Sequence, residues 1–362
     1  MTQLPKVDDG QRDLDRTGPG DTLDVRDDLP RTHRPGPRRL AVLLLALLLA
    51  ACLAESAVRQ AGDAVPTPPT WGTTFTDAKV RQMQALGGVE TVVLGSSIAN
   101  GGLAPEALQR DGDTGPTYNA AIPGSGVTTW RLWSEQVVLP LLEPRRAVIG
   151  VSVRDFNDHQ TDGGYARLTE SPGYQLATGS ASTERRVEAW FAQRSDFVRK
   201  RSALREPAKV LAWSRGEEVQ GWTRPELLAD GRYDGFDDNR YNETERLDRS
   251  LREDVFVDYA PGPVNVTELT GLVRAAQERG IEVTVVRMPA MEERMVTRGL
   301  LPETAVDGFD RALRAVTADT GAAYVDLSDL NDDEALFADY YHLREAGIRA
   351  VNQRVAQALA AG

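Results

Sequence analysis

Two short segments, far apart in the chain, carry residue types that together can perform nucleophilic catalysis. Ser97 ends the segment TVVLGSS, in which an apolar strand runs into a tight turn, and Asp339 stands three residues before His342. A serine hydroxyl becomes a nucleophile when a neighbouring imidazole accepts its proton, and a carboxylate can orient that imidazole. Taken singly, each segment also fits an ordinary turn or an exposed histidine, so the fold that positions them is decisive.

The composition narrows the chemistry further. The chain has three histidines, His33, His159 and His342, and one cysteine, Cys52, which lies in an apolar run near the N-terminus. We therefore expect neither an internal disulfide nor a catalytic thiol or cysteine-based zinc site. His159 lies in a polar stretch and is interpreted as an exposed loop residue. The net charge of −12 over 362 residues disfavours nucleic acid as the main partner.

The first sixty residues are typical of a targeting segment. Residues 1–39 are polar and predict a disordered cytoplasmic arm, and residues 40–58 begin with an uncharged run that follows a cluster of arginines. This pattern predicts a signal-anchor that leaves the rest of the chain outside the cytoplasm. The sequence LAAC, ending at Cys52, also matches a bacterial lipobox, and a simply cleaved signal is the third alternative. Residues 59–75 are expected to form a linker.

The globular part alternates apolar strands with amphipathic helices. Strands are expected at 89–94, 117–121, 147–153, 281–285 and 323–327. This alternation predicts an α/β fold with a mostly parallel five-stranded sheet and helices on both faces, formed by residues 76–362. Ser97 follows the first of these strands, and ligands of parallel sheets bind at the carboxyl ends of the strands.

A polar stretch, residues 154–262, interrupts this alternation and predicts a large insertion after the third strand. It contains one segment with helical periodicity, residues 183–205. We expect the insertion to form a lid or a substrate-binding face, in which tryptophans such as Trp190 either contact a glycan or simply pack. The acidic stretch 230–239 lacks EF-hand spacing and is interpreted as a solvated loop.

Three segments together resemble the SGNH/GDSL hydrolase family. The family's first block, which carries the nucleophile, is similar to LGSSIANGG. Its second block, whose glycine lends an N–H group to the oxyanion, is similar to YNAAIPGSG. Its last block, which carries Asp-x-x-His, is similar to FADYYHLREAGIRAVNQRVAQAL. The resemblance covers about residues 90–160 and 265–360 and implies a three-layer α/β/α, flavodoxin-like SGNH fold. It assigns Ser97, Asp339 and His342 to a catalytic triad that needs no metal or organic cofactor.

The resemblance also implies an oxyanion hole formed by the N–H groups of Ser97 and Gly124. The family's third block, Gly-x-Asn, is not clean here, because the strand AVIGVSV runs into RDFND. Asn157 is expected to be the oxyanion asparagine, although it lies further past the strand than in the family. Arg154 or Asp155 is the alternative residue facing the site.

Ser96 stands where many members have aspartate, a variant that resembles membrane-associated branches such as the D-alanyl transfer and alginate O-acetylation proteins. We therefore expect a membrane-anchored, extracytoplasmic serine esterase at a bacterial cell surface or periplasm. Its expected substrates are O-acyl, in particular O-acetyl, esters of a small molecule or an envelope polysaccharide. The alternatives are an O-acyltransferase with the same triad and a non-catalytic SGNH-like scaffold that binds envelope protein partners.

Overall fold

The computed structural model describes residues 36–160, 162–222, 226–234 and 245–361. The chain divides into two compact units, residues 1–54 and 55–362, and each is described by itself. Most of the predicted arm, 1–39, and the second half of the acidic stretch 230–239 lie outside the described residues.

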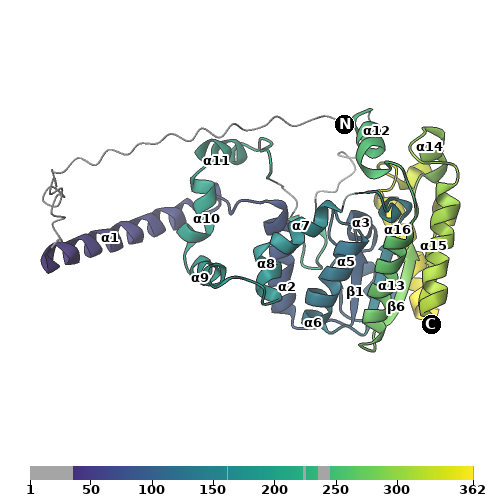
Figure 1. Ribbon diagram of the computed structural model, residues 1–362, viewed down its shortest axis with the longest axis horizontal. Helices are drawn as coiled ribbons and strands as arrows, with labels where there is room; N and C mark the ends of the chain where they lie inside the picture. The colour runs from purple at the N-terminus through teal and green to yellow at the C-terminus, as the bar shows by residue number, and fades with distance from the viewer. Residues whose placement is uncertain (1–35, 161, 223–225, 235–244, 362) are drawn as a thin grey trace, which may run out of the picture. The chain divides into compact units, whose positions relative to one another are not determined.

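A five-stranded sheet forms the centre of the second unit (Figure 1). Its strands are β1 (Thr91–Gly95), β2 (Thr117–Asn119), β3 (Arg146–Val151), β6 (Glu282–Arg287) and β7 (Ala323–Asp326), in the spatial order β2-β1-β3-β6-β7. Every neighbouring pair is parallel. The order reverses between β1 and β3, and the crevice at such a point is where open α/β sheets bind ligands. This topology confirms the predicted α/β fold class.

Helices cover both faces of the sheet. On one face, α5 (Val127–Trp133), α13 (Pro263–Gln277) and α15 (Ala305–Thr320) pack in a row. On the other face, α4 (Pro105–Gly112) packs against α16 (Glu345–Ala361). In α13 and α15 the buried apolar residues recur at helical spacing, so each helix buries one side. Gly87 and Gly321, both with left-handed backbones, end α2 (Ala78–Leu86) and α15.

Shorter elements complete the second unit. They are the π-helical turns η2 (Gly72–Asp77) and η3 (Ser134–Val138), the helices α3 (Ser97–Gly102), α6 (Leu139–Leu142) and α14 (Glu292–Thr297), and the 3-10 turns η1 (Gly62–Ala64), η4 (Val153–Phe156), η6 (Ser328–Leu330) and η7 (Glu334–Leu336). Residues 59–75, expected to be a linker, thus include helical turns, and Phe75 in η2 is buried in the core.

The insertion between β3 and β6 is mostly helical. It contains α7 (Gly163–Glu170), α8 (Pro172–Ala177), α9 (Thr183–Ala192), α10 (Asp196–Leu204), α11 (Pro207–Ser214), the hairpin β4 (Glu226–Leu227) and β5 (Tyr233–Asp234), α12 (Glu245–Ser250) and the π-helical turn η5 (Leu251–Val255). The single helix expected over 183–205 is wrong, because the segment forms α9 and α10. Ser195 separates them: its backbone is extended, and its hydroxyl accepts the N–H of Val198 as the N-cap of α10.

The first unit ends inside helix α1 (Pro37–Ala61). Most of the large apolar side chains of residues 40–54 are exposed. Among the described residues, this is the one helix with the length and hydropathy that a membrane crossing requires. A helix of this kind serves either as a membrane anchor or as a signal sequence.

Candidate active site

Ser97 is the first residue of α3 and follows β1, an interior strand of the sheet, after Ser96 alone. The register places Gly95 beside Gly150 of β3, and Gly95 has a φ of 139°, which disfavours side chains. A Cβ atom at Gly95 would lie 2.6 Å from the Gly150 carbonyl oxygen and 2.6 Å from the Ala99 Cβ. Glycine therefore allows the chain to turn sharply from β1 into α3. This turn places Ser97 at the carboxyl end of the strands.

Asp339 and His342 lie in a tight loop before α16. The loop is closed by the Ala338 N–H, which donates to the His342 carbonyl at 2.8 Å. Asp339 Oδ1 accepts the N–H groups of Tyr341 and His342 at 2.9 and 2.8 Å, and the residue is 2% exposed. Because one carboxylate oxygen is bound to the backbone, the other is held in a single direction.

The three residues form a continuous hydrogen-bonded chain. His342 Nδ1 lies 2.7 Å from Asp339 Oδ2, and His342 Nε2 lies 3.0 Å from Ser97 Oγ. An ionised carboxylate only accepts hydrogen bonds, so Nδ1 carries a proton and, in the neutral ring, Nε2 accepts the serine hydroxyl. The structure thus brings the three predicted residues together with the geometry of a nucleophile, a base and an orienting acid.

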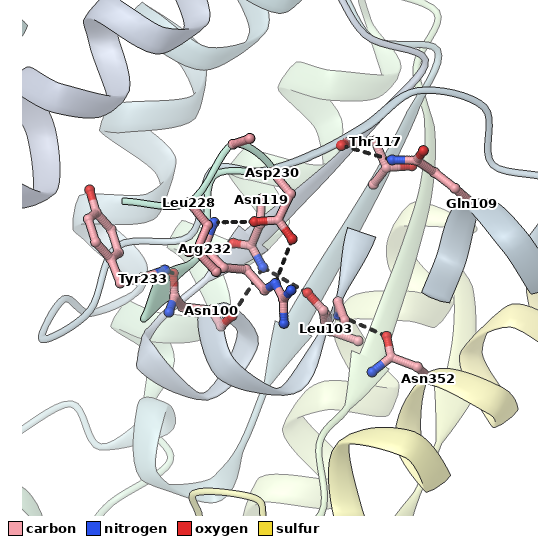
Figure 2. Close-up of polar contacts among 12 residues, drawn as sticks. Asn100, Leu103, Gln109, Thr117, Asn119, Leu228, Asp230, Arg232, Tyr233 and Asn352 are labelled. Atoms are coloured by element: carbon pink, nitrogen blue, oxygen red, sulfur yellow. Dashed lines mark hydrogen bonds and ion pairs between the residues drawn. The ribbon is translucent and has the colours of Figure 1, made fainter. Parts of the chain in front are cut away.

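Buried asparagine amides hold the segments around the triad together (Figure 2). Asn119, at the end of β2, donates to backbone carbonyls in α3 and at Leu103. Asn352 of α16 binds the backbone on either side of Leu103, donating to the Gly102 carbonyl and accepting the Ala104 N–H. These bonds fix α3, which begins with Ser97, against α16, which follows His342.

The hairpin β4–β5 of the insertion joins this network (Figure 2). The Asn119 N–H donates to the Asp230 carbonyl at 2.8 Å, and the Tyr233 N–H donates to Asn100 Oδ1 at 3.3 Å. Gly231 permits the close approach, since a Cβ atom there would lie 2.4 Å from the Asn119 carbonyl oxygen. The insertion therefore supports α3 directly.

The predicted oxyanion glycine, Gly124, lies in the loop between β2 and α5. The Ile122 N–H ties this loop to the end of β1 by donating to the Gly95 carbonyl at 2.9 Å. The Ser125 hydroxyl closes the loop by donating to the Ile122 carbonyl at 2.5 Å. Within the described part of the chain, the N–H groups of Gly124 and Ser97 have no hydrogen-bond partner. Both donors are therefore free to bind an oxyanion.

Asn157 does not join this arrangement, and the oxyanion role expected for it lacks a free donor. Its Nδ2 already donates to the carbonyls of Val255 and Val257 at 2.9 and 3.0 Å. Its Oδ1 accepts the N–H groups of His159 and Ala260. The 3-10 turn η4 separates Asn157 from β3, so its amide fastens the end of the insertion instead. His159 is exposed.

Arg154 and Asp155 of η4 form a buried ion pair beside the triad. Arg154 Nη1 lies 3.2 Å from Asp155 Oδ1, and Asp155 Oδ2 accepts the N–H and the hydroxyl of Ser152. The Arg154 guanidinium lies 5.9 Å from the centre of the Tyr341 ring, and its Nε has no partner among the described residues. Tyr341 was not anticipated; its only signal in the sequence is its place inside the Asp-x-x-His segment.

Burial governs the protonation of this group. It raises the pKa of Asp155, although Arg154 and Ser96 favour the carboxylate. It also raises the pKa of Tyr341 to about 12, against the effect of Arg154. Burial disfavours the charge of Arg154 too, but Tyr341 and Asp155 outweigh it and hold the guanidinium pKa above its usual range. Arg154 therefore stays a cation. It lies close to the turn before Ser97, because its partner Asp155 also contacts Ser96.

An open cleft with a cavity volume of about 70 Å³ lies beside the loop that carries Gly124. Its walls are formed by that loop, by the segment after β3 and by the start of α13. The lining residues are Gly124, Ser125, Gly126, Val127, Thr128, Arg154, Asp155, Asn157, Asp158, Gln160, Asp162, Gly163, Val264 and Asn265. Most of them are polar, and two of them, Gly124 and Asp155, also belong to the surroundings of Ser97.

Comparisons with known proteins give remote likenesses. No family model and no curated protein sequence matches the chain. Among solved structures, the chain is similar to a lipase/acylhydrolase from Enterococcus faecalis, with 14% identity, 75% of this chain and 96% of that chain covered, and a TM-score of 0.39. It is also similar to an acetyl xylan esterase, with 13% identity, 74% and 98% covered, and a TM-score of 0.37. At these identities and TM-scores, the chemistry must be inferred from the side chains themselves.

Proposed function

We propose that this chain is a serine hydrolase of the SGNH/GDSL type that cleaves carboxylic esters. The observation that carries the proposal is the hydrogen-bonded chain from Ser97 through His342 to Asp339, just past the carboxyl end of an interior strand of a parallel sheet. A non-catalytic scaffold has no physical need for three polar side chains in this geometry, two of which are buried. The geometry therefore favours the enzyme over the scaffold.

In the proposed reaction, His342 is the general base. Its Nε2 takes the proton of the Ser97 hydroxyl while Oγ attacks the ester carbonyl, and the Asp339 carboxylate stabilises the imidazolium. The N–H groups of Ser97 and Gly124 hold the oxyanion of the tetrahedral intermediate. His342 then gives its proton to the alcohol that leaves, and the acyl group remains on Ser97.

Deacylation repeats these steps with a second acceptor. Water, activated by His342, attacks the acyl-enzyme, releases the carboxylic acid and restores the Ser97 hydroxyl. A positioned base contributes about 10²–10⁴-fold to the rate, and one oxyanion donor about 10²–10³-fold. A sugar hydroxyl in place of water would make the same residues an O-acyltransferase.

We infer that the substrate is an O-acyl, in particular O-acetyl, ester on a glycan of the cell envelope. The cleft beside the loop that carries Gly124 supports this inference, because most of its lining residues are polar, which suits a hydroxylated ligand. Helix α1 supports a location outside the cytoplasm, since its apolar composition suits a membrane anchor or a signal.

The test compares the purified full chain with its Ser97→Ala variant. We expect the wild type to hydrolyse p-nitrophenyl acetate and to release acetate from an O-acetylated polysaccharide. The variant should unfold at the same temperature but lose about 10³-fold or more in turnover. A folded wild type that acts on neither substrate contradicts the esterase. Transfer of acetyl to an added oligosaccharide, seen by mass spectrometry without release of acetate, would identify the transferase instead.

A further inference from the structure

Exposed apolar side chains gather on two neighbouring helices of the insertion. Val187, Trp190 and Phe191 of α9 are 50, 51 and 49% exposed, and Phe197 of α10 is 39% exposed. We call these four residues the α9–α10 surface. Val187 lies one helical turn before both Trp190 and Phe191, and the rings of these two neighbours meet edge to face with their centres 4.9 Å apart. No residue of α9 is buried, so its apolar side is left largely uncovered within the described chain.

Basic residues surround the α9–α10 surface. Residues 183–215 contain nine Arg and Lys and four Asp and Glu, a net charge of +5 in a chain whose net charge is −12. The Arg194 guanidinium lies 4.2 Å from the centre of the Trp190 ring, and Arg186 is exposed. Aromatic rings bordered by arginines suit the boundary between lipid headgroups and acyl chains. The positive charge favours anionic lipids.

The α9–α10 surface also lies where the apolar segment 40–54 ends. Glu55, the next residue, accepts the Ser195 hydroxyl at 2.6 Å and the N–H groups of Asp196 and Phe197 at 3.0 Å each. Figure 1 shows the last turns of α1 beside α10. Glu55 follows Ala54 directly in the chain, so these hydrogen bonds keep the start of α10 next to the end of the apolar segment. A bilayer that holds the apolar segment would therefore have its headgroups close to Phe197.

We propose that the α9–α10 surface docks the catalytic unit onto an anionic lipid bilayer, with the rings of Trp190 and Phe191 at the level of the headgroups. The proposal rests on membrane attachment through α1 and goes beyond the esterase chemistry. Docking holds the catalytic unit at a fixed height above the lipid instead of leaving it free on a tether.

The test places the full chain in nanodiscs made of phosphatidylglycerol and bromine-labelled phosphatidylcholine. Bromine quenches tryptophan fluorescence only at short range, and Trp190 is one of six tryptophans. The difference between wild type and Trp190→Phe therefore reports on Trp190 alone. We expect bromine to quench the fluorescence of Trp190 in the wild type. The quenching should be weaker when a neutral lipid replaces phosphatidylglycerol.

A matched pair of variants separates docking from general damage. Val187→Ser with Phe191→Ser should restore the Trp190 signal, whereas Leu86→Ser, an exposed apolar position on α2 outside this surface, should not. Neither change should alter hydrolysis of p-nitrophenyl acetate, which keeps the esterase proposal separate from the outcome. An unquenched Trp190 in the wild type overturns the proposal and would point to a protein partner. A chain that does not stay with the nanodisc during gel filtration overturns it as well.

Discussion

The Arg154 guanidinium meets the Asp155 carboxylate at 3.2 Å, and both groups are almost fully withdrawn from water, at 12 and 0% side-chain exposure. The pair lies between two segments: it contacts the turn before Ser97 through Ser96, and the loop that carries His342 through Tyr341. Removing one partner of such a pair leaves a charge in a poorly polarisable environment. The effects of substitutions at Arg154 and Asp155 on stability are therefore expected to be coupled.

We expect Arg154→Met to lower the free energy of unfolding by about 3–5 kcal/mol, because the Asp155 carboxylate loses its cation. Asp155→Asn added to that background should recover part of the loss, since it removes the stranded charge. Urea unfolding of the two single variants and the double variant measures the coupling. Additive effects of the two substitutions would show that the ion pair contributes nothing.

Asn157→Ala should weaken the insertion more than the chemistry. The variant loses the bonds to Val255, Val257 and Ala260, so we expect faster hydrogen exchange across residues 255–260. The kcat on p-nitrophenyl acetate should fall by less than about 10-fold, against about 10²–10³-fold for a lost oxyanion donor. A loss of that larger size, with unchanged hydrogen exchange, would return Asn157 to the oxyanion hole.

Gly95→Ala should be severely destabilising. The added Cβ meets a backbone oxygen and the Ala99 Cβ at 2.6 Å, at a φ of 139° that alanine avoids. We expect a loss of about 3 kcal/mol or more in thermal unfolding, together with lost turnover. Gly101→Ala is the matched control: it lies in α3, the helix that follows Gly95, with open space around it, and it should change stability by about 1 kcal/mol or less. Equal effects of the two would refute the packing explanation.

Glu292 should make stability depend on pH. Burial raises its pKa to about 7, against the effect of its ion pair with Arg287, and the nearby charges of Asp310 and Asp332 add to the rise. A pKa raised on folding contributes stability at acid pH that is lost as the pH rises through the folded value. The free energy of unfolding should thus fall between pH 4.5 and about 7, by up to about 3 kcal/mol. In Glu292→Gln this fall should be missing; parallel pH profiles would count against the shift.

The triad could be predicted from sequence because its members follow local rules. An apolar strand, a glycine turn and an Asp-x-x-His segment each set their own geometry, and the strand order brings Ser97 to His342. Strands and major helices could also be predicted from local patterns, because an element that is buried on one side has apolar residues at a regular spacing. The start of α3 at Ser97 was not anticipated, and neither was the break at Ser195.

The remaining features depend on contacts between distant parts of the chain. The amide of Asn157 binds a carbonyl 98 residues away, and Asn119 binds both α3 and the hairpin of the insertion. No local pattern marks an asparagine as structural or catalytic, because its amide suits both roles. The pairing of Arg154 with Asp155 is local, but its burial against Tyr341 is not.

A fluorophosphonate probe tests the triad most directly, because it reacts covalently with an activated serine. The full chain, Ser97→Ala and His342→Gln would be incubated with the probe, and the labelled peptide identified by mass spectrometry. We predict one label on Ser97 in the wild type, none in Ser97→Ala, and labelling slowed by about 10²-fold or more in His342→Gln. A folded wild type that stays unlabelled, or a label that persists in Ser97→Ala, would contradict the serine hydrolase.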